Sequence, residues 1–301
     1  MAHFWKNKRV LITGASGFVG KHLTKRLAAL KASVDYFNEN VSDSNKVNSV
    51  FNSGKYHFCY HLAAQSLLNI AGKDPIPTFD TNIRGTWNVL EAARQNKLEG
   101  IIIASTTHVY GKNRLPFLET YYPRPTGPYE TSKACADILA QTYANYYALP
   151  VAIARCVNIY GPGDQNNRII PKTINFLLKN QHPEIFSNET TRDYMYIDDA
   201  TDAYITLGEN LKNLMKILSN ITFNFGTGKH YSNAYIVNRI IKLSATSSVK
   251  PIFLENNRKL EISKQYVSIQ KAKEFLNWKP HYSLDEGLKK TIKWYQEEKT
   301  L

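Results

Sequence analysis

A glycine-rich turn directly after the first apolar run constrains the fold of this chain most. The run from Val10 to Thr13 leads into a segment with glycine at Gly14, Gly17 and Gly20. A strand, a glycine turn and a helix start in this order are typical of the first unit of a parallel α/β sheet. Glycine lets backbone N–H groups approach an anion, and a helix N-terminus adds favourable partial charge. A tight turn also needs glycine for structural reasons, but this placement predicts a pyrophosphate site for a dinucleotide.

Short β-branched runs alternate with helical patterns through the first half of the chain. We expect strands at 9–13, 33–37, 56–62, 100–105 and 151–154, and helices at 19–30, 81–96 and 129–147. This alternation predicts an α/β fold with a doubly wound parallel sheet of the Rossmann type. Another strand-like run at 222–225 is expected to return to the same sheet.

The composition changes after Tyr160, where Gly161 to Asp164 form a loop signal and Pro171 lies in a new helical pattern. A length of 301 residues leaves room for a second, smaller core, because single cores stop growing near ~250–300 residues. We expect residues 1–160, with a return segment at about 195–228, to form the dinucleotide-binding domain. Residues 161–194 and 229–301 are expected to form a smaller, discontinuous C-terminal substrate domain.

The charge balance favours an anionic partner. Lys and Arg number 38 against 25 Asp and Glu, which gives a net charge of +13. Nucleic acid and phosphorylated small molecules both fit such a charge. The basic residues are dispersed along the chain, so we expect no nucleic-acid partner.

The cysteines indicate a reducing environment. Cys59, Cys135 and Cys156 have neither C-x-x-C spacing nor a nearby histidine cluster, which predicts no disulfide framework and no metal site. No apolar stretch reaches the ~18 residues that a membrane span needs, so no membrane association is expected. A cytoplasmic location is predicted.

The residues after the second predicted strand bear on the choice of dinucleotide. An acidic residue ~20 positions after the glycine turn binds the adenosine ribose of NAD in folds of this type. This chain has Asn38 there, with Glu39 next to it. No arginine follows the strand to favour the 2′-phosphate of NADP, so NAD is the predicted cofactor.

A tyrosine, a lysine and a hydroxyl suggest acid–base chemistry. Tyr129 and Lys133 are four residues apart and share one face of a predicted helix. An ammonium close to a phenol stabilises phenolate, so the tyrosine could act as a base near neutral pH. The apolar run at 101–104 ends in Ser105 and Thr106, at the sheet edge where ligands bind. Such pairs also occur on solvated helices, and such hydroxyls can cap turns, but their combination with the glycine turn favours catalysis.

Several motifs in the right order resemble the extended short-chain dehydrogenases/reductases, and among them the NAD-dependent sugar-nucleotide epimerase/dehydratase family. The resemblance covers nearly the whole chain. Within the family, the sequence most resembles CDP-glucose 4,6-dehydratases and hexose 4-epimerases. Besides the G-x-x-G-x-x-G turn, the motifs are His61 to Gln65, Thr81-Asn82 with Gly85-Thr86, Ser105 to Gly111, Tyr129 to Lys133, Tyr160 to Gly163, Arg192-Asp193-Tyr194 and Leu276 to Pro280.

The resemblance implies roles for individual residues. Tyr129 would be the catalytic base, Lys133 its partner and a ribose ligand, and Thr106 the hydroxyl that binds the reacting sugar oxygen. The implied NAD contacts are Gly14, Ser16, Gly17, Phe18, Val19, Gly20, Asn38, Asp43, Leu62, Ala63, Ala64, Gln65, Asn82, Ser105, Tyr129, Lys133 and Cys156. The implied contacts to a nucleotide-diphosphate sugar are Gln65, Thr107, His108, Asn158, Arg168, Ile170, Arg192 and Arg258. Family members commonly dimerise through the helices at 85–94 and 129–147, so a homodimer is expected.

The chain departs from the family pattern at Thr107 and His108. Dehydratases of the family usually carry aspartate and glutamate there, which protonate the leaving C6 hydroxyl and remove the C5 proton. Threonine cannot supply that acid at neutral pH, whereas a histidine, with an unperturbed pKa of ~6.5, can exchange a proton and is counted with the catalytic candidates. A lone histidine beside a strand end is also commonly structural.

We therefore predict a sugar-nucleotide epimerase that works through a 4-keto intermediate. The alternatives are a 4,6-dehydratase, a 4-keto reductase or dehydrogenase, and, from another class, a non-catalytic nucleotide- or RNA-binding member of the fold.

Overall fold

A parallel sheet of six strands forms the centre of the larger part of the molecule. The computed structural model describes residues 4–164, 168–186, 190–245, 249–254 and 262–298. The sheet has the order β10-β5-β4-β3-β1-β2, and every neighbouring pair is parallel. Its strands are β1 (Arg9–Thr13), β2 (Ser33–Phe37), β3 (Phe58–His61), β4 (Gly100–Thr106), β5 (Val151–Cys156) and β10 (Thr222–Phe225). The predicted doubly wound sheet is confirmed.

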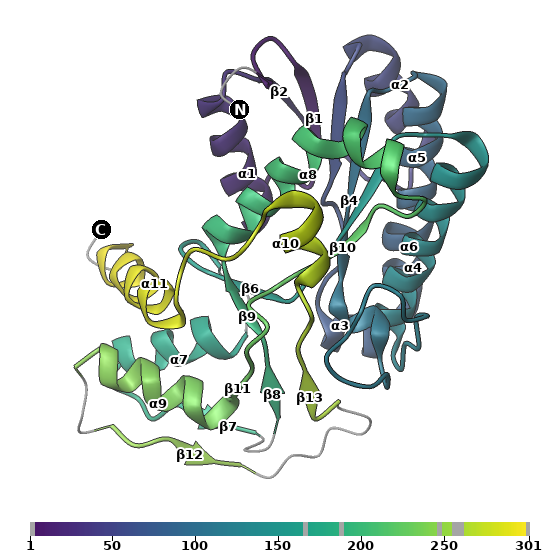
Figure 1. Cartoon of the computed structure of the whole chain (residues 1–301). Helices are drawn as coiled ribbons and strands as arrows, with labels where there is room; N and C mark the ends of the chain where they lie inside the picture. Colours follow the sequence, from purple (N-terminus) through teal and green to yellow (C-terminus); the bar gives the residue numbers. More distant parts are fainter. Residues whose placement is uncertain (1–3, 165–167, 187–189, 246–248, 255–261, 299–301) are drawn as a thin grey trace.

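Both faces of this sheet are buried at its central strands, which explains why β1, β3, β4 and β5 are mainly apolar. Val10 and Ile12 of β1 pack into one hydrophobic cluster, and Leu11 between them packs into another. Because successive side chains point to opposite faces, helices must cover both sides. The helices α1 (Phe18–Ala29) and α8 (Ile197–Ile217) cover one face. On the other face lie α2 (Ser44–Gly54), α5 (Gly85–Gln95) and α6 (Pro128–Tyr147) (Figure 1).

Short elements lead from the strand ends toward the helices. The segment after β3 forms α3 (Leu68–Lys73), α4 (Pro75–Phe79) and the π-helical turn η1 (Asp80–Arg84), which continues into α5. The sequence pattern predicted one uninterrupted helix from residue 81, whereas the structure begins it with a π turn that buries Asn82. A turn of 3₁₀ helix, η2 (Thr107–Tyr110), follows β4.

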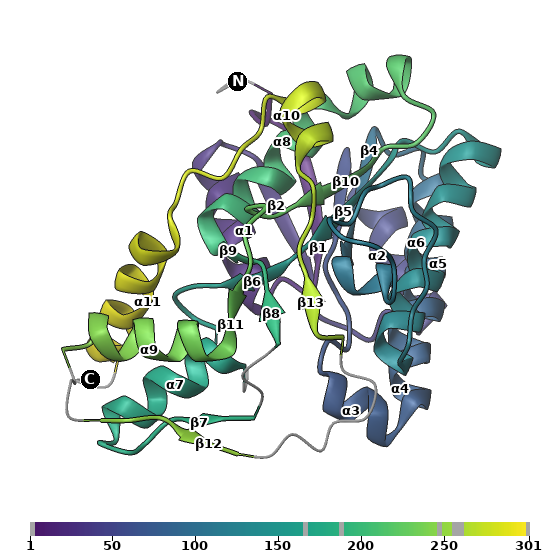
Figure 2. The same cartoon turned by 60° about the horizontal axis from the view of Figure 1, so that its bottom comes forward.

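The remaining elements gather around a third hydrophobic cluster. Helices α7 (Ile169–Leu178), α9 (Asn233–Leu243) and α11 (Leu284–Glu298) supply most of its side chains, and Figure 2 shows them together at the lower left. The strands here are short: β6 (Asn158–Tyr160) with β9 (Tyr194–Tyr196), β7 (Glu184–Ile185) with β12 (Ile252–Phe253), and β8 (Thr191–Arg192) between β11 (Tyr231–Ser232) and β13 (Lys264–Gln265). Helix α10 (Gln270–Leu276) packs beside β10. No helix in the described residues is long and apolar enough to cross a membrane.

A buried carboxylate ties the C-terminal segment to the sheet-covering helix α8. Asp199, which is 1% exposed, accepts hydrogen bonds from the backbone N–H groups of His281 (2.8 Å) and Tyr282 (3.2 Å). These residues directly precede α11, so the contact fixes where that helix begins relative to α8.

Replacing Asp199 with Ala should therefore destabilise the protein by about 1–3 kcal/mol, because two backbone donors lose their acceptor. Denaturant unfolding measures this loss. Asp202→Ala, one turn further along α8, serves as the control and should cost clearly less. Equal losses in the two variants would contradict the anchoring role of Asp199.

Candidate active site

A cleft lies at the carboxyl ends of β1, β3, β4 and β5, where ligands bind in open parallel sheets. Its volume is about 530 Å³. Four polar side chains that the sequence singled out, those of Thr106, His108, Tyr129 and Lys133, meet there. The other predicted residues that line it are Gly14, Ser16, Gly17, Phe18, Val19, Gly20, Leu62, Ala63, Ala64, Ser105, Cys156, Asn158 and Arg168.

Other predicted residues stand outside the described lining. They are Asn38, Asp43, Gln65, Asn82, Thr107, Ile170 and Arg192. Asp43 instead caps α2, where its carboxylate accepts from the N–H groups of Asn45 and Lys46. Ile170 packs in the third hydrophobic cluster, and Arg192 donates to the carbonyl of Thr191. Arg258 lies outside the residues that the structure describes.

The lining also contains residues that sequence reasoning did not assign. They are Glu39, Asn40, Val41, Ser66, Leu68, Thr81, Ala104, Val157, Ile159 and Tyr204. Glu39 and Asn40 stand where Asn38 was expected to reach the cofactor. Tyr204 comes from α8, and the helical spacing of Ala200, Ala203, Tyr204 and Leu207, all buried, is the signal that could have found it.

The glycine turn forms a cradle that fits a pyrophosphate. Gly14 has φ +73°, and a Cβ there would lie 2.7 Å from the backbone nitrogen of Ala63; a Cβ on Gly20 would lie 2.3 Å from the Gly14 carbonyl oxygen. Both positions therefore need glycine for packing. A Cβ on Gly17 would meet only the Gly14 oxygen, at 3.2 Å, so this glycine keeps space open in front of the helix. No described side chain caps α1, and its first turn is free of acidic residues, which leaves its N–H groups to an anion.

Buried hydrogen bonds hold the strand ends behind this cradle. His61 is 2% exposed and bonds Thr13 through Nδ1 (2.7 Å) and Thr86 through Nε2 (3.0 Å). Burial lowers the pKa of His61 to about 3, and the charge of Lys133 acts in the same direction. The imidazole is thus neutral at physiological pH and joins β1, β3 and α5.

Two predicted cofactor residues serve to position the chain after β3. The Asn82 side chain accepts from the Gln65 N–H (2.8 Å) and donates to the Gln65 carbonyl (2.9 Å) and to Ser132 (2.8 Å). The Gln65 amide in turn donates to Thr78 (2.9 Å). These contacts connect the floor of the cleft to α6, which carries Tyr129 and Lys133.

The tyrosine, lysine and threonine meet as the spacing predicted, but their electrostatics differ from the prediction. Lys133 donates through Nζ to the carbonyl of Ala104 (2.5 Å). Burial lowers its pKa to about 8, against the opposing effects of Asp137 and Cys156. Burial also raises the pKa of Tyr129 to about 12; Arg168 and a hydrogen bond with Thr106 act against this rise. The main cation that lowers the pKa of the phenol is therefore Arg168 in this structure, where Lys133 was expected.

A second acid–base pair lies beside the phenol. Nδ1 of His108 is 3.8 Å from Oε1 of Glu130, and both side chains are largely buried. The imidazole also makes an edge contact with the Tyr129 ring, at 6.2 Å between centroids. Burial alone would raise the pKa of Glu130, but the hydrogen bond and charge of His108 outweigh it and hold the pKa below its usual value. Sequence reasoning proposed His108 and missed Glu130, although Glu130 directly follows the catalytic candidate Tyr129.

Comparison with known proteins agrees with this site. The sequence model of the NAD dependent epimerase/dehydratase family matches residues 10–224. The chain is 28% identical to the UDP-glucuronate 4-epimerase of Thermodesulfobacterium geofontis, over 95% of this chain and 96% of that protein. It is 29% identical to the human dTDP-D-glucose 4,6-dehydratase, over 96% and 90% of the two chains. A solved UDP-glucose 4-epimerase from Thermotoga maritima superposes with a TM-score of 0.89 at 26% identity, over 96% and 99% of the two chains.

The family match covers more than half of the chain and includes the glycine cradle, the threonine and the tyrosine–lysine pair. This protein belongs to the NAD-dependent epimerase/dehydratase family, and NAD is its cofactor.

Proposed function

We propose that this enzyme is a sugar-nucleotide 4-epimerase that works through a 4-keto intermediate. One observation supports this most: Thr106 and Tyr129 line the same cleft, which begins at the uncapped N-terminus of α1. An anion-binding end and a hydroxyl–phenol pair in one cleft suit a substrate that is oxidised and reduced at an alcohol carbon.

The chemistry follows from the groups at the end of β4. Tyr129 takes the proton of the sugar hydroxyl at C4, and Thr106 donates a hydrogen bond to the same oxygen. Bound NAD supplies a hydride acceptor and donor for the C4 carbon. Tyr129 then gives its proton back to the oxygen when hydride returns to the opposite face of the ketone. Lys133 is held on the Ala104 carbonyl, and Arg168 is the cation that acts against the rise in the pKa of the Tyr129 phenol.

The cationic groups of the cleft favour a diphosphate on the substrate. Arg168 and Asn158 line its far side, and Arg168 stands at the N-terminus of α7. A guanidinium beside a helix N-terminus is a suitable partner for phosphate oxygens. The curated relatives act on UDP- and dTDP-sugars by their names, and the same substrate class is proposed here.

The His108–Glu130 pair keeps a 4,6-dehydratase as the second candidate. Elimination of water needs a proton donor and a base besides Tyr129. Thr107, 3% exposed, is buried outside the described lining and offers neither, whereas His108 lines the cleft. Epimerisation makes no such demand and ranks first.

The domain division stays part of the proposal. Residues 1–160 with a return segment at about 195–228 would bind NAD, and 161–194 with 229–301 would bind the sugar nucleotide. The pairing of β10 with β5 and the packing of α8 on the main sheet support the return segment. The separate cluster around α7, α9 and α11 supports the second domain. A cytoplasmic location also stays a prediction, supported by the free thiols of all three cysteines.

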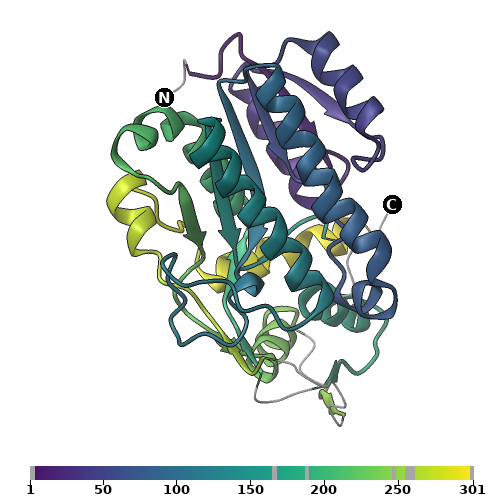
Figure 3. The ribbon, with the colours of Figure 1, turned by 90° about the vertical axis from the view of Figure 1, so that its right-hand side faces the viewer.

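We further propose a twofold homodimer through α5 and α6, which run side by side across the face seen in Figure 3. This face carries exposed apolar side chains: Trp87 is 55% exposed, Ile138 52%, and Ile76 on the adjoining α4 69%. Exposed apolar side chains that gather on neighbouring elements mark interaction sites, and aromatic residues are enriched in them.

Tyr129→Phe tests the base. The variant keeps the ring but loses the ionisable oxygen, so turnover should fall by the ~10²–10⁴ that a general acid–base group contributes, while NAD still binds. Steady-state kinetics and calorimetry with NAD measure the two effects. Turnover within about threefold of the parent would contradict the assignment.

The reaction type is tested with labelled solvent. A thermal-shift panel of UDP-, GDP-, CDP- and dTDP-hexoses identifies the substrate, since a ligand at 100 times its Kd stabilises by ~2.7 kcal/mol. In deuterated water, C4 epimerisation should leave C5 unlabelled, as NMR of the product will show. A 6-deoxy-4-keto product with deuterium at C5 would establish dehydration instead, and loss of that label in His108→Ala would identify the acid–base group.

The dimer is tested with Trp87→Glu. A charge at this exposed position of α5 should halve the mass measured by light scattering at micromolar concentration. Tyr122→Glu, at a loop position that is 86% exposed, is the control and should stay dimeric. A monomeric parent protein would refute the proposal.

A further inference from the structure

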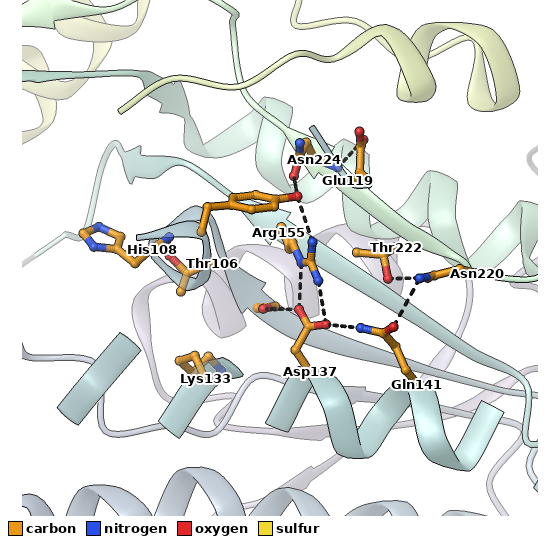
Figure 4. Close-up of polar contacts among 12 residues, drawn as sticks. Thr106, His108, Glu119, Lys133, Asp137, Gln141, Arg155, Asn220, Thr222 and Asn224 are labelled. Atoms are coloured by element: carbon orange, nitrogen blue, oxygen red, sulfur yellow. Dashed lines mark hydrogen bonds and ion pairs between the residues drawn. The ribbon is translucent and has the colours of Figure 1, made fainter. Parts of the chain in front are cut away.

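A fully buried ion pair lies directly behind the catalytic side chains. Asp137 of α6 and Arg155 of β5 are 0% and 2% exposed. The guanidinium binds the carboxylate with two parallel bonds, Nε to Oδ2 at 2.8 Å and Nη2 to Oδ1 at 2.9 Å. In Figure 4, Thr106, His108 and Lys133 lie to the left of this pair. The proposed reaction does not use either charge.

The carboxylate of Asp137 holds the catalytic helix on the catalytic strand. Its Oδ2 accepts from Ser105, the residue before Thr106, at 2.9 Å. Lys133, one turn earlier on α6, donates to Ala104, the residue before Ser105. Two contacts from successive turns of α6 thus bind β4 immediately before Thr106. They set the distance between that hydroxyl and the helix that carries Tyr129.

The guanidinium of Arg155 holds the turn that carries His108. Its Nη1 donates to the Tyr110 hydroxyl at 2.8 Å, and the guanidinium stacks over the Tyr110 ring at 4.8 Å from the centroid. Tyr110 closes η2, the 3₁₀ turn that contains Thr107 and His108. Arg155 also stands opposite Ser105 in the register of β4 and β5.

The network continues outward to the edge strand of the sheet. Tyr110 donates to Oδ1 of Asn224 on β10 at 2.7 Å, and the N–H of Asn224 donates to Glu119 at 2.9 Å. Gln141 binds Oδ1 of Asp137 at 2.7 Å and receives a bond from Asn220 at 3.2 Å. Figure 4 shows these contacts extending from Asp137 and Arg155 to Gln141 and Asn220 on one side and to Asn224 and Glu119 on the other. The carboxylate of Asp137 thus accepts four hydrogen bonds, and all three nitrogens of the Arg155 guanidinium donate at least one.

Stability alone does not account for such a pair. Desolvation of two charges offsets most of their attraction, and apolar replacements of similar volume are often neutral or stabilising. Hydrogen bonds are directional, whereas apolar contacts are not, so a network of hydrogen bonds can hold neighbouring elements at fixed distances. We propose that Asp137 and Arg155 are the positioning residues of the active site, which hold Thr106, Lys133 and the His108 turn in catalytic register. This inference rests on the proposed 4-keto chemistry for its kinetic readout.

The test replaces the pair by apolar side chains of similar size in the double variant Asp137→Leu/Arg155→Met. This variant leaves no unpaired buried charge, so its unfolding temperature should be close to that of the parent, and its Kd for NAD should change by less than about threefold. We expect kcat to fall about 10- to 100-fold with KM little changed, because misplacement by about 1 Å costs rates of this size. The matched control is Arg239→Met/Asp285→Leu, which removes another bidentate pair on α9 and α11 and should keep kcat.

A second readout does not depend on the identity of the substrate. Amide hydrogen exchange at 105–111 and 129–133 should be faster in the Asp137→Leu/Arg155→Met variant, at equal global stability. If the parent enzyme turns over none of the sugar nucleotides, the proposed function fails while this measurement still tests the positioning role. A stable double variant with parental kcat, or with parental exchange at both segments, overturns the proposal.

Two single variants decide the question if the double variant does not fold. Ser105→Ala and Tyr110→Phe each keep the ion pair and remove one bond from it to the catalytic strand or turn. Each should lower kcat about three- to tenfold at unchanged KM. Parental kcat in both variants overturns the proposal as well.

Discussion

The active site depends on the close approach of two backbones at the carboxyl end of β1. Gly14 lies so near the segment after β3 that a Cβ would come within 2.7 Å of the Ala63 nitrogen. This approach is reinforced by Thr13, whose hydroxyl binds His61 and also accepts from the Ala63 N–H at 3.3 Å. Because β1 lies between β2 and β3 in the sheet, the contact puts the N-terminus of α1 and the chain after β3 on the same side of the cleft. The anion cradle and the cofactor floor are thus built by one packing constraint.

The fold could be predicted from the sequence wherever the buried residues follow a regular spacing along the chain. The strands β1, β2 and β10 begin and end at the predicted residues, because each is a short run that is bounded by turn residues. Helix α8 was missed as an element because it follows β9 with no loop between them, although Asp198 and Asp199 in its first turn are a start signal. The π turn before α5 was missed because the apolar period continues through it while Asn82 turns inward to bind Gln65 and Ser132.

The sequence predicted several of the residues that line the cleft, but it did not predict their pKa values or their contacts. Of the polar residues that line the cleft, Thr106, His108, Tyr129, Lys133 and Arg168 were named from the sequence, whereas Glu39, Asn40, Ser66, Thr81 and Tyr204 were not assigned. What spacing cannot supply is the balance between burial and charge. The sequence suggested that Lys133 would favour the phenolate of Tyr129, yet burial dominates and the pKa of the phenol rises to about 12. Lys133 itself donates a hydrogen bond to the Ala104 carbonyl, a contact that depends on how α6 packs on β4 and cannot be read from the sequence. In this structure the phenol therefore holds its proton at neutral pH, and Tyr129 acts as the base of the proposed reaction only when bound ligands lower that pKa.

The choice between epimerisation and dehydration comes down to the His108–Glu130 pair. The chain has no carboxylic acid at the two positions after Thr106, and the nearest carboxylate, Glu130, is held ionised by His108. Dehydration needs a donor for the leaving hydroxyl and an acceptor for the C5 proton at the same time. His108 and Glu130 contact each other at 3.8 Å, so each would have to leave its partner to serve as that donor or acceptor. Separation of this largely buried pair would leave its polar atoms without their partner, a cost that epimerisation through Tyr129 and Thr106 avoids. The same pair that makes dehydration conceivable in this chain is thus, in its present geometry, the physical reason to place epimerisation first.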